Sequence, residues 1–237
     1  MLFYHLFASP FCITFGYTST LNITLFSLTV IFPLVFTIRE AFKRRDNVIQ
    51  LLSVFTSSLN AAYYTFITNP KMGDESKAFI AQKLEDLSTL FFDSPYSSKH
   101  DATKTRSKLT AIFEFLKTNR KTIPHGLTIK IILLLKDGQK NMENTIGISM
   151  HGIPVSLRAY CLVFIYFFPF IFVPTLVTEL DHYGAYLFYM IATKPSFILI
   201  CLYNIQERME DPFDQSGLDD IKGRGFSFEL PKPNHLA

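Results

Sequence analysis

Acidic side chains gather in a short segment that begins where the last long apolar stretch of the chain ends. Residues 210–214 read Glu-Asp-Pro-Phe-Asp, and Asp219 and Asp220 follow. Pro212 breaks a helix because proline lacks an N–H and clashes with the preceding turn, so the carboxylates are expected in an irregular loop. Carboxylate oxygens are the ligands that hard cations require. Acidic residues with Pro and Gly are also ordinary loop chemistry, so both interpretations stay open.

A second candidate group is Lys194, which lies inside an otherwise uncharged stretch, residues 183–204. If this stretch crosses a membrane, a Lys near its middle costs at least about 2.5 to 3.5 kcal/mol on insertion scales. Intramembrane charges are by default functional candidates, and Lys194 could attract an anion or pair with a carboxylate. Alternatively, Pro195 breaks the helix, the span tilts, and Lys194 reaches water through a crevice.

Catalytic signatures are absent from the sequence. The six His form no ligand pair at helical or zinc-finger spacing. No GxSxG, Walker or GxGxxG motif occurs. We therefore predict that the chain is not an enzyme.

Composition and charge spacing predict an integral membrane protein. Aromatic residues reach 15%, with 25 Phe, and charged residues make up 18%, below the ~25% of soluble domains. Stretches of about 20 apolar residues match the ~30 Å hydrocarbon core of a bilayer. Four stretches carry no Lys, Arg, Asp or Glu apart from Lys194: residues 1–17, 21–38, 159–178 and 183–204. The first lacks the basic start of a signal peptide, so we expect a short or truncated first span.

The positions of the cations predict the topology. Of 23 Lys and Arg, all but Lys194 fall in two blocks, residues 39–158 and 208–232. The short connections at residues 18–20 and 179–182 carry none, so the positive-inside rule places both blocks and both termini in the cytoplasm. We predict an all-α protein of the cell membrane, with four transmembrane helices in two hairpins. Its parts are a first hairpin (1–38), a cytoplasmic helical domain (39–154), a second hairpin (155–204) and an acidic cytoplasmic tail (205–237). The net charge of +3 fits this pattern and gives no separate indication of nucleic-acid binding.

Helical periodicity runs through the predicted cytoplasmic domain. Residues 39–66 continue from the second span without a breaker. Their apolar residues alternate steps of four and three, which is a helix-packing seam: Val48, Leu52, Phe55, Leu59, Ala62 and Phe66. Residues 75–92 form a second helix with Ile80, Leu84, Leu87 and Phe91 on one face. We expect a polar loop at residues 93–107, followed by helices at residues 108–119 and 127–144.

Three segments resemble the bestrophin family of anion channels. They are the acidic turn at residues 210–213 with the two acids after it, residues 153–160 followed by Phe168-Pro169-Phe170, and residues 39–45. The last segment, Arg-Glu-Ala-Phe-Lys-Arg-Arg, is similar to the bacterial and algal branch of the family. The resemblance covers about residues 21–66 and 150–222, and only helical character matches between them. The family's usual cytoplasmic segment before the first span is missing, so an incomplete amino terminus stays open.

This resemblance implies a homopentamer in the lipid bilayer, with a central pore for small anions such as chloride or bicarbonate. Each subunit would line the pore with its second span. Leu28, Phe32 and Phe36 recur every four residues on one helix face, and five copies would form apolar rings that gate by dewetting. Such a stripe can also pack against another helix or lipid. Glu40 is next on this face, and a ring of acids at the inner mouth would not favour anions, but the adjacent Arg39 could offset it. Arg39 and Lys194 are the candidate anion contacts.

The resemblance also bears on calcium binding. Animal members of the family hold calcium in a loop of this kind, and Asp219 matches an acidic ligand position counted from the structural turn at Pro212 and Phe213. Gln215 and Ser216 stand where animal members carry two acids. The acids that remain could support only a weak calcium site, with Asp214 and Asp220 beside Asp219. We expect no cofactor, and a structural role in which the acids pair with basic helix ends.

Our interpretation is therefore a bestrophin-like anion channel. The alternative is a non-conducting membrane scaffold whose cytoplasmic helical bundle binds a partner. A pore requires Leu28, Phe32 and Phe36 to face the central axis of an oligomer. A scaffold requires them to be buried within one subunit or to face lipid.

Overall fold

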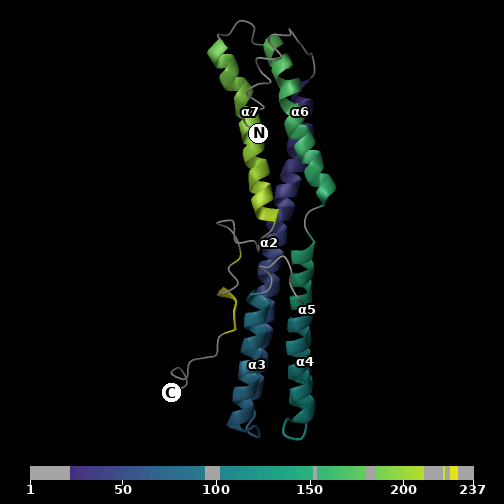
Figure 1. The fold of residues 1–237 in the computed structure, drawn as a ribbon, viewed down its shortest axis with the longest axis vertical. Coiled ribbons are helices and arrows are strands. Elements are labelled where there is room, and N and C mark those ends of the chain that lie inside the picture. Colours follow the sequence, from purple (N-terminus) through teal and green to yellow (C-terminus); the bar gives the residue numbers. More distant parts are fainter. Residues whose placement is uncertain are drawn as a thin grey trace. The chain divides into compact units, whose positions relative to one another are not determined.

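A computed structural model describes residues 22–93, 102–151, 154–179, 185–210, 221 and 225–228. Six α-helices follow one another in this part of the chain (Figure 1): α2 Ile23–Ile67, α3 Asp74–Asp93, α4 Ala102–Thr118, α5 His125–Met150, α6 Val155–Glu179 and α7 Ala185–Glu210. The predicted all-helical fold is confirmed for these residues. The apolar stretch 1–17 lies outside them.

The chain divides into two compact units. The first unit consists of Met1–Lys43 and Gly152–Asp211, and the second of Arg44–His151 and Pro212–Ala237. Helices α6 and α7 belong to the first unit, and α3, α4 and α5 to the second. Helix α2 contributes to both, because it runs without interruption through the boundary between them.

The core of the first unit lies between α6, α7 and the first part of α2. Helices α6 and α7 pack against each other. Their buried side chains form one hydrophobic cluster with those of α2: Val30, Leu34, Cys161, Ile165, Phe168, Phe172, Val173, Leu176, Leu199, Ile200 and Tyr203. All three helices contain prolines in their interior: Pro33, Pro169, Pro174 and Pro195. Interior prolines are rare in soluble helices and more frequent in transmembrane ones.

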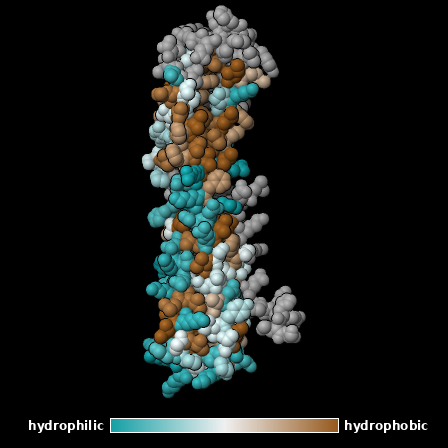
Figure 2. Space-filling model, turned by 180° about the vertical axis from the view of Figure 1, so that it is seen from behind, coloured by the Kyte–Doolittle hydropathy of each residue, from teal (hydrophilic) through white to brown (hydrophobic). Residues whose placement is uncertain are grey.

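Apolar side chains also cover much of the outside of the first unit (Figure 2). Phe167, Phe197 and Ile198 each expose more than half of their surface. Soluble proteins rarely leave such large contiguous apolar areas in water, whereas lipid tails solvate them. By length and composition, one stretch in the described part of the chain qualifies as a membrane span. It lies within His125–Leu176 and has a mean hydropathy of 2.0. The count of four spans stays a prediction.

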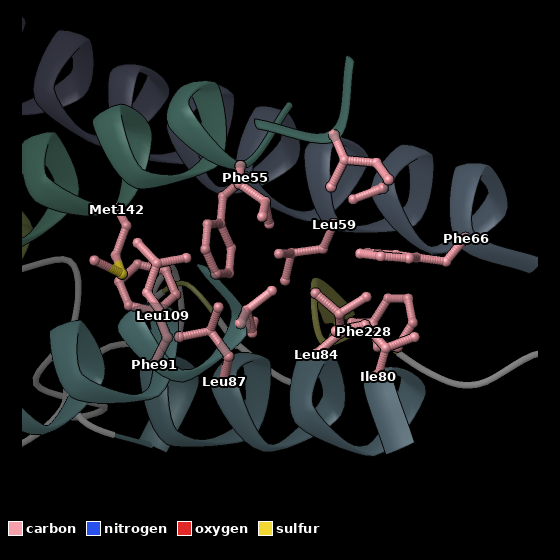
Figure 3. Packing of buried hydrophobic residues seen from close by; sticks show 14 of the residues in the cluster. Phe55, Leu59, Phe66, Ile80, Leu84, Leu87, Phe91, Leu109, Met142 and Phe228 are labelled. Carbon is pink, nitrogen blue, oxygen red and sulfur yellow. The ribbon is translucent and has the colours of Figure 1, made fainter. Parts of the chain in front are cut away.

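The core of the second unit is built from the later part of α2 together with α3, α4 and α5 (Figure 3). Helix α3 packs against α4, and α4 against α5. At its centre the ring of Phe55 lies 4.5 Å from that of Phe91 and 6.0 Å from that of Phe92, measured between centroids. Such tilted and edge-on aromatic pairs add to the stabilisation that burial alone provides.

The predicted packing seam of α2 and the predicted apolar face of α3 are both confirmed. All the residues predicted for the seam and for the face are buried. They are Val48, Leu52, Phe55, Leu59, Ala62 and Phe66 on α2, and Ile80, Leu84, Leu87 and Phe91 on α3. Steps of three and four residues keep side chains on one side of a helix, and in both helices that side faces the core.

The predicted polar loop at residues 93–107 is wrong in its last part, because α4 already begins at Ala102. Tertiary contacts hold this extra turn. Thr105 is completely buried, and Arg106 forms a two-pronged ion pair with Glu143 of α5, at 2.6 Å for both Nε–Oε1 and Nη2–Oε2. These hydrogen bonds, and then the charge of Glu143, raise the pKa of Arg106 above its ordinary value, so the guanidinium stays charged. Polar composition alone predicted a loop because it does not report such contacts.

Candidate pore-lining face

Helix α2 has one buried face that repeats over nearly all of its length. Its members recur at steps of three, four or seven residues, which keeps them on one side of an α-helix. Those before Arg44 belong to the core of the first unit and those after it to the core of the second. They are Val30, Leu34, Ala41, Val48, Leu52, Phe55, Leu59, Ala62 and Phe66.

The three predicted gate residues lie on the opposite side of α2. Leu28 is 45% exposed, Phe32 52% and Phe36 55%. The rings of Phe32 and Phe36 stack along the helix, with centroids 6.1 Å apart and planes inclined by 22°. The structure therefore does not bury any of the three within the subunit. Their outer surfaces are available to other subunits, to lipid or to a water-filled axis.

This exposed side of α2 becomes polar beyond Phe36. Arg39 and Lys43 follow at steps of three and four residues, and both are exposed, as is Glu40. Gln50 and Ser57 continue the same side in the second unit and are exposed as well. From residue 47 to residue 70 the chain carries no charged side chain. Val54 and Tyr64 lie on this side too and are 46% and 52% exposed. One helix side thus runs from large apolar residues, through a short charged zone, to a stretch that is uncharged and mixes polar with apolar residues.

Lys194 is exposed on α7, whereas the three predicted gate residues lie on α2. Helix α7 continues through Pro195 as far as Glu210, so Pro195 does not end the helix. The expected break of the helix at Pro195 is therefore wrong, whereas the tilt of the span and the access of Lys194 to water stay predictions. The neighbours of Lys194 on the exposed side of α7, Phe197 and Ile198, are large and apolar.

The predicted acidic site lies outside the described residues. This applies to Asp214, Asp219 and Asp220 and to the turn at Pro212 and Phe213. Helix α7 ends at Glu210, two residues before Pro212, as expected for a helix that stops ahead of a proline. Within the described ranges, no group of three or more His, Cys, Asp or Glu side chains is arranged to hold a metal ion.

Sequence reasoning missed two contacts of the second unit that join distant segments. Arg44 of α2 donates a hydrogen bond through Nη2 to the backbone oxygen of Ile148, near the end of α5. Residues 225–228 of the C-terminal tail pack against α2 and α3, with Phe228 almost completely buried. The alternation of Phe226 and Phe228 around Ser227 is the one sequence signal that could have indicated this contact, and it is only three residues long.

Comparison with known proteins places this arrangement of helices among membrane-protein folds. No known protein family and no curated protein matches the sequence. Solved structures do match. A bacterial Bestrophin homolog from Klebsiella pneumoniae superposes with a TM-score of 0.81 at 11% identity, covering 95% of this chain and 91% of that chain. A single-residue variant of a bacterial Bestrophin homolog from the same organism gives 0.83 at 11% identity, covering 95% and 93%. A further match, described as a membrane protein, gives 0.81 at 12% identity over 95% and 93%.

The chain therefore has the fold of the bacterial bestrophin homologs, along nearly its whole length and nearly the whole length of theirs. The resemblance noted in the sequence and the fold found in the structure point to the same group of proteins. Because the identity is only 11–12%, what carries over directly is the arrangement of the helices.

Proposed function

We propose that this chain is an integral membrane protein and one subunit of a homo-oligomeric, bestrophin-type anion channel. Its pore is lined by the exposed side of α2, with Leu28, Phe32 and Phe36 as an apolar constriction. The oligomer is a pentamer in the cell membrane, with both termini in the cytoplasm. The fold supports the proposed class of protein, a bestrophin-type channel. The exposed side chains of α2 are the groups that line the proposed pore.

One observation carries the proposal: the stripe of Leu28, Phe32 and Phe36 stands on the side of α2 that faces away from the subunit's own core. Around a symmetry axis, such stripes from several subunits form stacked apolar rings. A narrow apolar ring expels water, so it blocks ions when closed and admits them after a small widening.

The residues after the stripe fit an anion path. Arg39 is exposed one helical turn beyond Phe36 and is our candidate anion contact, since a guanidinium offers five N–H donors at constant charge. Glu40 is also exposed, and its carboxylate repels anions. The attraction of an anion to Arg39 therefore has to exceed its repulsion by Glu40. Lys194 is the second candidate contact, on α7.

We propose no tight calcium site. Asp219 with Asp214 and Asp220 supplies carboxylates for a weak site at most, because Gln215 and Ser216 replace two acids at the positions where animal bestrophins carry them. A calcium ion takes six to eight oxygen ligands, and each lost carboxylate weakens its binding. The acids then act in the structure of the tail, beside the basic helix ends.

A pair of neighbouring serines on α2 tests the pore directly. Ser57 is exposed on the proposed pore side, whereas Ser58 is 7% exposed in the core of the second unit. We expect purified wild-type protein in liposomes to conduct halide, measured with a halide-quenched dye. A thiol reagent carrying a sulfonate should then inhibit the S57C variant and leave S58C and the wild type unchanged. The wild type controls for the natural cysteines.

Two outcomes contradict the proposal. If wild-type liposomes show no halide flux above that of empty ones, the chain is not a channel, and the scaffold alternative is favoured. If halide flux is present but the reagent leaves S57C as active as S58C, the exposed side of α2 does not line the path.

A further inference from the structure

The segment Gly225–Phe228, called the strap from here on, is held between two helices of the second unit. Phe228 is 2% exposed and belongs to the core cluster, and Phe226 packs against the same cluster. Figure 3 shows Phe228 beside Ile80 and Leu84 of α3. Ile221, shortly before the strap, is also buried. The strap therefore reaches the interior, although it belongs to none of the α-helices.

Each of the two helices supplies a polar contact to the backbone of the strap. The N–H of Phe228 donates a hydrogen bond of 2.7 Å to Oγ of Ser88 on α3. On the α2 side, Oγ1 of Thr56 donates to the backbone oxygen of Phe226. The ring of Phe228 meets Tyr63 of α2 edge-on, with centroids 5.6 Å apart. Thr56, Tyr63 and Ser88 thus form a site on α2 and α3, called the strap site.

Ser88 is informative because it is completely buried in an otherwise apolar surface of α3. A buried hydroxyl without a partner is costly, whereas one that accepts a hydrogen bond from a peptide N–H is stabilised and also fixes the position of that peptide. The strap site therefore carries polar groups placed for a main chain, together with apolar surface for alternate side chains. This combination is how extended peptides are recognised: backbone hydrogen bonds give affinity, and pockets for alternate residues give specificity.

We propose that the strap site is a binding site for an extended peptide of the pattern aromatic–small–aromatic, and that the strap is its intramolecular ligand. The strap bridges α2 and α3 and holds them together. Because it is attached through a polypeptide tether, its effective concentration at the site is about millimolar, and a free peptide of the same sequence competes with it. The proposal does not depend on whether the chain conducts anions.

The test uses the full-length protein in detergent and a dye-labelled peptide of residues 222–231, Lys-Gly-Arg-Gly-Phe-Ser-Phe-Glu-Leu-Pro. The F228A variant of the protein loses the main anchor of its own strap. We expect the peptide to bind F228A at least about 10-fold more tightly than wild type, as measured by fluorescence anisotropy, because wild type keeps its site occupied. The same peptide carrying F228A should bind neither protein.

Neighbouring residues of α3 provide a matched control. Ser88 is buried in the strap site, and the adjacent Thr89 is exposed. Adding S88V to the F228A protein removes the hydrogen-bond acceptor and should weaken peptide binding about 10-fold. Adding T89V should leave the affinity unchanged. Equal effects of the two substitutions would overturn the assignment of Ser88, and absence of peptide binding to folded F228A would overturn the proposal.

A second measurement decides the question if F228A does not fold. In the wild type, the amide of Phe228 exchanges with solvent only when the strap leaves its site. Excess peptide should accelerate this exchange several-fold, and the F228A peptide should not. Unchanged exchange at millimolar peptide would show that the strap is a permanent part of the core, and the proposal would be wrong.

Discussion

Replacing Phe32 and Phe36 together with alanine separates a gate from a packing surface. Truncation of a fully buried Phe costs about 3–5 kcal/mol in soluble cores. Phe32 and Phe36 keep 52% and 55% of their surface outside the subunit, so we expect each truncation to cost less than half of that, roughly 1–2 kcal/mol. Phe55 is only 1% exposed and contacts two further rings, so F55A should show the full loss.

The double variant should keep its oligomer and change its conduction. Five copies lose ten phenyl rings from the proposed constriction, which widens it and admits water. We expect size-exclusion chromatography in detergent to give the wild-type oligomer, and thermal unfolding to lie much closer to wild type than that of F55A. Halide flux into liposomes should rise, or the flux should lose its gating.

Two results would refute this reasoning. A dissociated oligomer with unchanged flux per folded protein would mean that the rings pack between subunits and do not gate. An intact oligomer with unchanged flux would mean that the stripe faces lipid. F55A distinguishes both from a general loss of folding, because it perturbs the core of the second unit and leaves the stripe intact.

Three further predictions follow from the packing, the acidic tail and the topology. G138A should raise the melting temperature, because a Cβ there would lie 3.5 Å from that of Ser58, an ordinary contact, and Ala is favoured over Gly by roughly 0.5–1 kcal/mol inside a helix; a lower melting temperature would show that the contact is too tight. Chelation of calcium should leave halide flux unchanged, and activation by micromolar calcium would reveal a tight site in the tail. Accessibility tags after Ala237 and within residues 93–107 should report cytoplasm, and a tag at Leu180 the outside; an external 93–107 segment would disprove the four-span topology.

The helices of the second unit could be predicted largely because hydrophobic periodicity and burial coincide there. Val48 to Phe66 on α2 and Ile80 to Phe91 on α3 have helical spacing, and each faces the core. The start of α4 could not be predicted, since Thr105 and Arg106 are polar and their helical state depends on contacts with other helices. The strap could not be predicted for a similar reason, because its anchors are two Phe in an irregular tail.

The candidate pore is harder to predict, because an apolar stripe on one helix side has the same sequence signature whether it faces lipid, another helix or a narrow axis. Burial removes the interpretation in which the stripe packs inside its own subunit, since Phe32 and Phe36 lie outside the core. The later residues of the same side of α2 do not bear on lipid, because the predicted topology places residues 39–154 in the cytoplasm. The choice between lipid and a pore axis for the stripe therefore depends on the double alanine variant.

Bulk water would favour a different composition on that side of α2. Helices of the second unit that face solvent carry charged residues such as Lys104 on α4 and Lys136 on α5, as surface helices usually do. The exposed side of α2 carries none between residues 47 and 70. An exposed but uncharged surface is what we expect of a wall along a confined path, with the fixed charges gathered in the short zone of Arg39, Glu40 and Lys43. For this reason we favour a pore-lining side over one that faces bulk water, and modification of S57C compared with S58C tests this side of the helix in its uncharged part.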